Sequence, residues 1–254
     1  MTFVIAEIGV NHNGSLEQAI RLVHESKKAG ADAVKFQYFN SHRLWGDDRI
    51  SQYELYPHQL AALKGLCDRE EIEFMCTPFG AQEVEFLTPL VKRHKVGSGC
   101  RNHKILYAIR DAGLPVIASM GMASWDDVER LRKHLSGCDI TYLQCTSSYP
   151  CQPKDVHLNA MVKLLVMTQA KVGFSDHTEG ILAAPMAVAM GASVIEKHIT
   201  LNRNSIGPDH KASIEPHDFK LMVDNIREVE TMLGKPDMKI LSCEKQLWGA
   251  WYDG

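Results

Sequence analysis

The chain has 254 residues, of which 45% are hydrophobic and 23% charged, and its formal net charge at pH 7 is −3. This composition suits one large globular core, and such a small, dispersed charge excludes the basic surface that binds nucleic acid or acidic membranes. None of the seven cysteines forms a Cys-x-x-Cys pair, and we expect neither a secretory signal nor a membrane-spanning run, so a cytoplasmic protein is predicted.

Eight short apolar runs alternate along the chain with longer segments of helical length. The runs cover residues 3–8, 33–36, 72–76, 94–96, 115–118, 140–145, 171–174 and 193–198. Ser15 can cap the first helical segment, residues 15–29, which has one apolar stripe. The last amphipathic helix is predicted to start at Glu215 and to end near Leu233, with its apolar face packed on the core.

Eight strand–helix units in one chain favour a closed (β/α)8 TIM barrel, which is an α/β fold, over an open doubly wound sheet. No Gly-x-Gly-x-x-Gly turn follows a predicted strand, as it would in a dinucleotide-binding open sheet. We therefore expect a single barrel domain over residues 1–235 and a short C-terminal tail over 236–254, without a second domain.

Lysines and hydroxyl residues gather where the predicted strands end, which is the side on which such barrels carry their active sites. The lysines are Lys35, Lys95 and Lys197, and the interleaved hydroxyl residues are Thr77, Ser98, Ser119 and Ser175. Ammonium groups, hydroxyls and nearby glycines together suit a phosphate and a carboxylate. Met120 and Met122, in the same region, are interpreted as packing residues.

Two histidines end neighbouring predicted strands, His177 after the run 171–174 and His198 at the end of the run 193–198. Because adjacent strand ends meet in a barrel, these imidazoles can share a transition metal and leave positions open for substrate and water. His12 is a third candidate, although Asn-His-Asn-Gly is also typical of a turn.

Four carboxylates also lie at or after strand ends: Glu7, Asp176, Glu196 and Asp209. They could orient ligands, bind sugar hydroxyls, move protons or simply pair with the lysines. The loop 206–212, which contains glycine and proline, is placed to cover the site.

An ordered set of motifs resembles the N-acylneuraminate (sialic acid) synthase family. The motifs are IAEIGVNHNG at 5–14, AGADAVKFQ at 29–37, TPF at 77–79, KVGSG at 95–99, SMGM at 119–122, CT at 145–146 with YP at 149–150, the two histidine segments, and GPDHKAS at 207–213. They follow one another from residue 3 to about residue 234, so the resemblance covers nearly the whole chain.

The resemblance implies condensation of phosphoenolpyruvate with an N-acylated, mannosamine-like aldose, which gives a nonulosonic 2-keto acid and phosphate. By motif match, phosphoenolpyruvate would bind to Lys35, Thr77, Lys95, Ser98, Ser119 and Ser175, and the sugar to Gln37, Tyr149 and Asp209. A divalent metal, Mn²⁺ in the family with Mg²⁺ or Co²⁺ as alternatives, would be held by His177 and His198. Catalytic roles would fall to Lys35, Lys95, Glu7 and Glu196, and the residue types do not decide which glutamate assists proton transfer.

Departures from the family pattern affect the expected substrate and partners. Members of the family carry a C-terminal antifreeze-like domain that contributes to the sugar pocket, and we expect it to be absent here or supplied by a separate chain. A homo-oligomer is a further expectation. Ser147 stands where some members have asparagine, and Cys100 where glutamate is usual.

Two alternatives remain open at the level of the residues. One is condensation of phosphoenolpyruvate with a phosphorylated aldose, for which Arg43, Arg101 and Arg203 are the candidates to bind the second phosphate. The other is a non-catalytic barrel that binds sugar or phosphoenolpyruvate.

Overall fold

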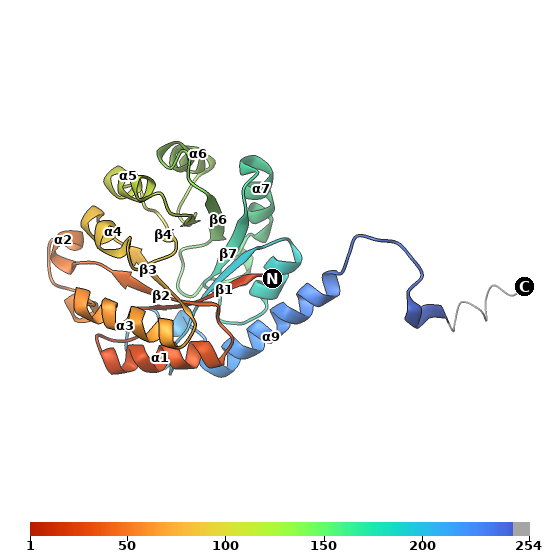
Figure 1. Cartoon of the computed structure of the whole chain (residues 1–254), viewed down its shortest axis with the longest axis horizontal. Coiled ribbons are helices and arrows are strands. Elements are labelled where there is room, and N and C mark those ends of the chain that lie inside the picture. Colours follow the sequence, from red (N-terminus) through yellow and green to blue (C-terminus); the bar gives the residue numbers. More distant parts are fainter. Residues whose placement is uncertain (246–254) are drawn as a thin grey trace, which may run out of the picture.

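A computed structural model describes residues 1–245 of the chain and shows a ring of strands enclosed by helices (Figure 1). The strands are β1 Phe3–Gly9, β2 Ala33–Tyr38, β3 Glu73–Pro78, β4 His94–Val96, β5 Val116–Ser119, β6 Ile140–Cys145, β7 Val172–Asp176 and β8 Val194–His198. The helices are α1 Leu16–Lys28, α2 Ser41–Trp45, α3 Pro57–Arg69, α4 Ala81–Leu87, α5 His103–Ala112, α6 Trp125–His134, α7 Leu158–Thr168, α8 Ala183–Ala189 and α9 Pro216–Leu233. Of the expected tail over 236–254, residues 246–254 lie outside the described part.

Backbone hydrogen bonds join the strands in the order β3-β2-β1-β8-β7-β6-β5-β4, and every ladder is parallel. The two ends of this order meet because β3 also contacts β4. The strands at the two ends of this order, β3 and β4, are therefore neighbours, which gives a nearly closed (β/α)8 barrel. The predicted fold class is confirmed, and the open doubly wound alternative is wrong.

Alternation along the strands divides the core into two layers. The residues that point inward fill the barrel interior and include Ile5, Met75 and Leu143, all fully buried. The residues that point outward, such as Val4 and Ile195, pack against the surrounding helices. The interior below the strand ends is thus closed by side chains, so any cavity opens at the C-terminal end of the barrel.

The predicted terminal helices form as the sequence indicates. The Ser15 side chain accepts a hydrogen bond from the backbone N–H of Gln18 and caps α1. Helix α9 begins after Glu215 with a proline in its first turn, and it buries Phe219, Met222, Val223 and Ile226. The prediction that this stripe packs on the core is confirmed.

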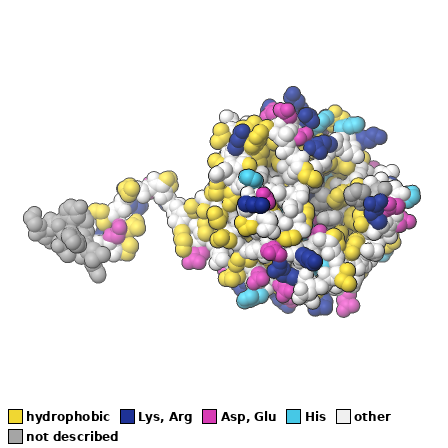
Figure 2. Space-filling view, turned by 180° about the vertical axis from the view of Figure 1, so that it is seen from behind, with side chains coloured by type: hydrophobic (Ala, Val, Ile, Leu, Met, Phe, Trp, Pro, Cys, Tyr) yellow, Lys and Arg dark blue, Asp and Glu magenta, His cyan; other side chains and the backbone are white. Residues whose placement is uncertain are grey.

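Within residues 1–245 the surface offers no long apolar helix, and the face seen in Figure 2 has no field of one charge. Among residues 1–245, no helix is long and apolar enough to cross a membrane. Lysine and arginine side chains alternate with aspartate and glutamate over the face seen in Figure 2. The mixed charges agree with the small net charge of the sequence.

The connection between β2 and α3, residues 39–56, is longer than a simple turn and contains α2. Ser41 holds it together, because its hydroxyl donates to Asp47 O at 2.8 Å and accepts from the Ile50 N–H at 3.3 Å. The connection also touches the turn after β1, where a Cβ on Gly14 would lie 2.1 Å from Gln52 O. Gly14, with a φ of +76°, permits this close approach.

Candidate active site

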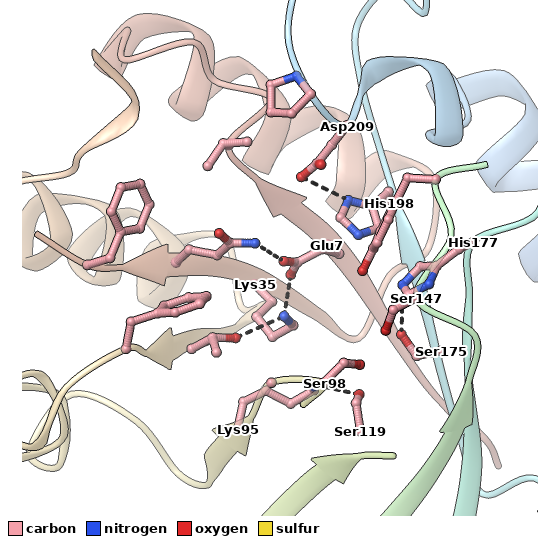
Figure 3. A pocket seen from close by; sticks show the side chains of 18 of the residues that line it. Glu7, Lys35, Lys95, Ser98, Ser119, Ser147, Ser175, His177, His198 and Asp209 are labelled. Carbon is pink, nitrogen blue, oxygen red and sulfur yellow. Dashed lines mark hydrogen bonds and ion pairs between the residues drawn. The ribbon is translucent and has the colours of Figure 1, made fainter. Parts of the chain in front are cut away.

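A cavity of about 350 Å³ lies at the C-terminal ends of the strands (Figure 3). All the residues to which the family resemblance gave a role in catalysis, substrate binding or metal binding line it: Glu7, Lys35, Gln37, Thr77, Lys95, Ser98, Ser119, Tyr149, Ser175, His177, Glu196, His198 and Asp209. These residues come from strands far apart in sequence, and the barrel brings their ends together.

Buried charges of both signs alternate across the floor of the cavity. The Lys35 ammonium lies 2.7 Å from Glu7 Oε2 and 3.7 Å from Glu196 Oε2, and the Lys95 ammonium lies 3.6 Å from Glu196 Oε1. Lys35 donates to the Thr77 hydroxyl at 3.0 Å, and Lys95 donates to the Ser119 hydroxyl at 2.7 Å. The lysines therefore carry hydroxyl neighbours and have their charges directed into the cavity.

The pKa values of the two buried glutamates, Glu7 and Glu196, are shifted in opposite directions. Burial raises the pKa of Glu7 to about 7; Lys35 opposes this rise and Glu196 adds to it. Burial also acts to raise the pKa of Glu196, but Lys35 and Lys95 outweigh it and the pKa is lowered. Glu196 is therefore the stably ionised carboxylate, and Glu7 is the one that can exchange a proton near neutral pH.

The two histidines of the sequence prediction face each other across β7 and β8. Their ring centroids are 5.5 Å apart, and the Tyr149 ring lies 4.2 Å from that of His177 and 5.7 Å from that of His198. Burial lowers the pKa of both imidazoles. Both side chains are therefore neutral at pH 7, the form that binds metal ions.

The donor set fits the divalent metal that the family resemblance implies. Nδ1 of His177 lies 2.8 Å from Thr146 O, an outer contact that fixes the ring, and Nε2, which lies 3.4 Å from the Ser175 hydroxyl, is the nitrogen that could bind an ion. Nδ1 of His198 is buried without a hydrogen-bond partner and lies 3.7 Å from Asp209 Oδ2. Within residues 1–245, no three His, Cys, Asp or Glu side chains form a ready metal cluster, so two imidazoles would leave the other coordination positions to substrate and water.

The residues assigned to the sugar lie above this floor. Gln37 donates to Glu7 Oε1 at 3.3 Å, and Asp209 follows the last strand in the loop that contains Pro208. Burial raises the pKa of Asp209 to about 6. Pro208 also lines the cavity, as the predicted covering role of this loop requires.

Two residues placed in the ring by the sequence point the other way. Lys197 and Asp176 form a fully buried ion pair of 3.0 Å on the outer face of the barrel, and neither lines the cavity. Each sits next to an inward-pointing histidine, and successive side chains of a strand point to opposite faces. The predicted phosphate role of Lys197 is therefore wrong, and Asp176 takes the alternative that the sequence left open for the carboxylates, pairing with a lysine.

His12 takes the structural option that its sequence context left open. Its Nδ1 accepts a hydrogen bond from the backbone N–H of Gly14 at 3.0 Å, which stabilises the turn after β1. His12 is fully buried and does not line the cavity.

Several lining residues were not found from the sequence. The apolar ones are Val10, Phe39, Leu44, Ile50, Tyr53, Phe79 and Met122, and Ser147 adds a hydroxyl. Met120 is buried as predicted, but Met122 is 64% exposed and lines the cavity, so its packing interpretation is wrong. The only available signal was proximity to a strand end, and Leu44, Ile50 and Tyr53 lie too far along the β2–α3 connection to carry it.

The fold and the cavity define a class, the (β/α)8-barrel enzymes, here with buried lysines and carboxylates at the strand ends. The model of the NeuB family matches residues 22–238, and the chain belongs to this family. The resemblance to the sialic acid synthases and the prediction of a synthase-type transferase are thereby confirmed.

Individual relatives agree with this assignment. The chain is 40% identical to the N,N'-diacetyllegionaminic acid synthase of Legionella pneumophila, over 93% of this chain and 74% of that protein. It is 35% identical to the human N-acetylneuraminate-9-phosphate synthase, over 95% and 74% respectively. Among solved structures, the N-acetylneuraminic acid synthetase of Leptospira borgpetersenii, in complex with citrate, superposes with a TM-score of 0.92 at 32% identity, over 98% of this chain and 90% of that one.

Proposed function

We propose that the chain condenses phosphoenolpyruvate with an N-acylated aminosugar to give a nonulosonic 2-keto acid and phosphate. The observation that carries the proposal is the alternating floor of Lys35, Glu196 and Lys95, with hydroxyls beside each lysine and two neutral histidines within the same cavity. The relatives that are named synthases of sialic and legionaminic acids support it.

Phosphoenolpyruvate would lie on the lysine side of the floor. Its phosphate and carboxylate require cationic and hydroxyl donors, which Lys35, Lys95, Ser119 and Thr77 supply at short range. Ser98 and Ser175 line the same region, and Ser175 donates to Glu196 Oε1 at 2.9 Å. These contacts would stabilise negative charge on the phosphate as the bond to carbon breaks.

His177 and His198 would hold the divalent metal, with Mn²⁺ as the family's ion. When bound, such an ion supplies Lewis-acid polarisation of the sugar aldehyde. Tyr149, Gln37 and Asp209 would orient the sugar so that its aldehyde carbon faces the methylene carbon of phosphoenolpyruvate. A carbon–carbon bond forms there, water adds to the oxygen-bearing carbon, and phosphate leaves by cleavage of the carbon–oxygen bond.

Glu7 is the better candidate than Glu196 to assist proton transfer. Its raised pKa lets it accept a proton from the attacking water near pH 7, whereas Glu196 is held as a carboxylate by two lysines. Glu196 would instead neutralise the lysines and orient them, through its contacts of 3.6 and 3.7 Å. In this proposal the protein acts in the cytoplasm, and a homo-oligomer or a separate antifreeze-like chain completes the sugar pocket.

The test follows phosphate release from phosphoenolpyruvate with Mn²⁺ and a panel of aldoses that contains N-acetylmannosamine, diacetamido hexoses and arabinose 5-phosphate. We expect release with an N-acylated aminosugar, loss of release after chelation, and recovery when Mn²⁺ is restored. The His198→Ala variant should lose the metal, while His217→Ala, at an exposed position of α9, should not. Binding of phosphoenolpyruvate and metal without release from any sugar would contradict the proposal and favour a binding barrel.

A further inference from the structure

The mouth of the cavity is apolar on the side of β2 and β3. Phe39, Leu44, Ile50 and Tyr53 come from the β2–α3 connection and Phe79 follows β3, and together they form what we term the apolar rim. The rings of Phe39 and Phe79 meet edge to face at 5.9 Å. Leu44 remains 37% exposed although it lines the cavity, so it is available to a ligand.

The remote end of a bound sugar extends toward the mouth, which the apolar rim borders on the side of β2 and β3. The floor carries the charges that the chemistry needs, and the residues below it, such as Met75 and Leu143, fill the barrel. A sugar whose aldehyde carbon lies at the floor can therefore extend only toward the mouth. The hydrogen bonds of Ser41 hold the β2–α3 connection in place, so this part of the mouth is preformed.

The described lining of the cavity has no spare positive charge for a second phosphate. Among the described lining residues, the lysines are Lys35 and Lys95, and both lie within 4 Å of a glutamate. They face three lining carboxylates, those of Glu7, Glu196 and Asp209. A phosphate at the remote end of the sugar would add charge to a site whose cations are already engaged by carboxylates and phosphoenolpyruvate.

The three arginines that the sequence offered for a second phosphate are engaged elsewhere. Arg43 pairs with Glu83 and Gln82. Arg101 donates to Met122 O at 2.8 Å, and Arg203 donates to Lys211 O at 3.0 Å. None of the three lines the cavity.

We infer that the sugar substrate carries no phosphate and presents an apolar group, an N-acyl or deoxy methyl, to the apolar rim. This inference rests on the proposed condensation and narrows its substrate class. Each methyl buried at the rim should raise kcat/KM about fourfold. A phosphate placed at the apolar rim would lose hydrating water without gaining a cation, and the loss in kcat/KM would be far larger than the gain from one methyl.

The test compares kcat/KM for phosphate release by the full chain with Mn²⁺ and three sugars. These are 2,4-diacetamido-2,4,6-trideoxymannose, N-acetylmannosamine and N-acetylmannosamine 6-phosphate. We expect the first to be preferred and the 6-phosphate to be at least about tenfold worse than N-acetylmannosamine. Equal or better use of the 6-phosphate would overturn the inference and leave the condensation standing, whereas no release from any sugar would remove both.

Variants of the apolar rim test whether these residues cause the preference for an unphosphorylated sugar. A lysine in Ile50→Lys or Leu44→Lys should raise the ratio of kcat/KM for the 6-phosphate over N-acetylmannosamine about tenfold. Val166→Lys, which places the same charge on an exposed apolar position of α7 outside the cavity, should leave the ratio unchanged. Thermal melts confirm that each variant is folded. An unchanged ratio in both folded rim variants would contradict the assignment of the apolar rim to the remote end of the sugar.

Discussion

Glu196 shows how single residues set the chemistry of this cavity. Its carboxylate is almost fully buried, yet the two ammonium groups of Lys35 and Lys95 keep it ionised from opposite sides. The same arrangement keeps the lysines close together without bringing their charges into direct contact. Removing one member of this set therefore changes the charge state of the others as well as a ligand contact.

The substitution Lys95→Met should weaken phosphoenolpyruvate binding. Glu196 keeps Lys35 as a partner at 3.7 Å, so the main loss is one charge-assisted contact to the substrate, worth about 1.5–3 kcal/mol. Titration calorimetry at constant Mn²⁺ should show affinity reduced about tenfold to 150-fold. The control is Lys92→Met, which changes an exposed lysine just before β4 that does not line the cavity. Equal affinities in the two variants would exclude Lys95 from the phosphoenolpyruvate site.

The substitution Glu7→Gln should change the pH dependence of kcat. As a base, Glu7 acts in its ionised form, so activity should fall as the pH drops through its pKa of about 7. The glutamine variant should be slower by about 10²–10⁴-fold and should lack this acidic limb. The exposed Glu85→Gln variant should keep the native profile. If the acidic limb persists in Glu7→Gln, another group takes the proton.

At the scale of elements, successive side chains of β8 point alternately into the cavity and to the outer face of the barrel. Glu196 and His198 line the cavity, while Lys197 between them is fully buried on the outer face. The Lys197 ammonium pairs with Asp176 and donates to Thr178 O at 2.6 Å. Asp176 and Thr178 flank His177, so one outer lysine ties together the strand ends that carry both histidines.

The substitution Lys197→Met should destabilise the barrel strongly. It leaves the Asp176 carboxylate buried without its partner, and loss of one member of a buried pair costs about 3–5 kcal/mol. Urea unfolding at pH 7 measures the free energy of unfolding. Lys220→Met removes an exposed pair of α9 with Asp224 and should cost about 0.5 kcal/mol or less. Similar losses in the two variants would show that the buried pair contributes little.

The elements of the fold could be predicted closely, because the spacing of apolar residues differs between strands and helices. All eight strands occur where short apolar runs indicated them, and β4 and β6 agree at both ends. The directions of Lys197 and Asp176 were not predicted, because proximity to a strand end does not specify the face. The rim positions Leu44, Ile50 and Tyr53 were also missed, since the β2–α3 connection has no strand or helix period that would orient them.

At the scale of the whole molecule, buried histidines link stability to pH. Burial lowers the pKa of both His12 and His94 to about 4. Between pH 6.5 and about 4 the unfolded chain binds protons at these positions while the folded chain does not. The contribution of each buried neutral histidine to the free energy of unfolding is therefore fully present above pH 6.5 and is lost as the pH drops toward 4, by up to about 3 kcal/mol for each histidine.

The substitution His94→Gln should flatten this acid dependence. Glutamine keeps a polar contact to Thr88, whose hydroxyl lies 3.1 Å from His94 Nε2, but it does not titrate. Urea unfolding at pH 7 and pH 4.5 should show a smaller difference in the free energy of unfolding than in the native chain. His217→Gln, at an exposed position, should preserve the native difference. A native-sized difference in His94→Gln would mean that this side chain is protonated within the folded barrel.

The filled interior of the barrel has a consequence for the order in which substrates bind and products leave. Because Ile5, Met75 and Leu143 close the space below the lysines, ligands reach the floor through the mouth, which the apolar rim borders on the side of β2 and β3. A molecule that occupies the mouth blocks the path to the floor. Phosphoenolpyruvate should therefore bind before the sugar and phosphate should leave after the new acid, which inhibition patterns in steady-state kinetics would reveal as a compulsory sequence.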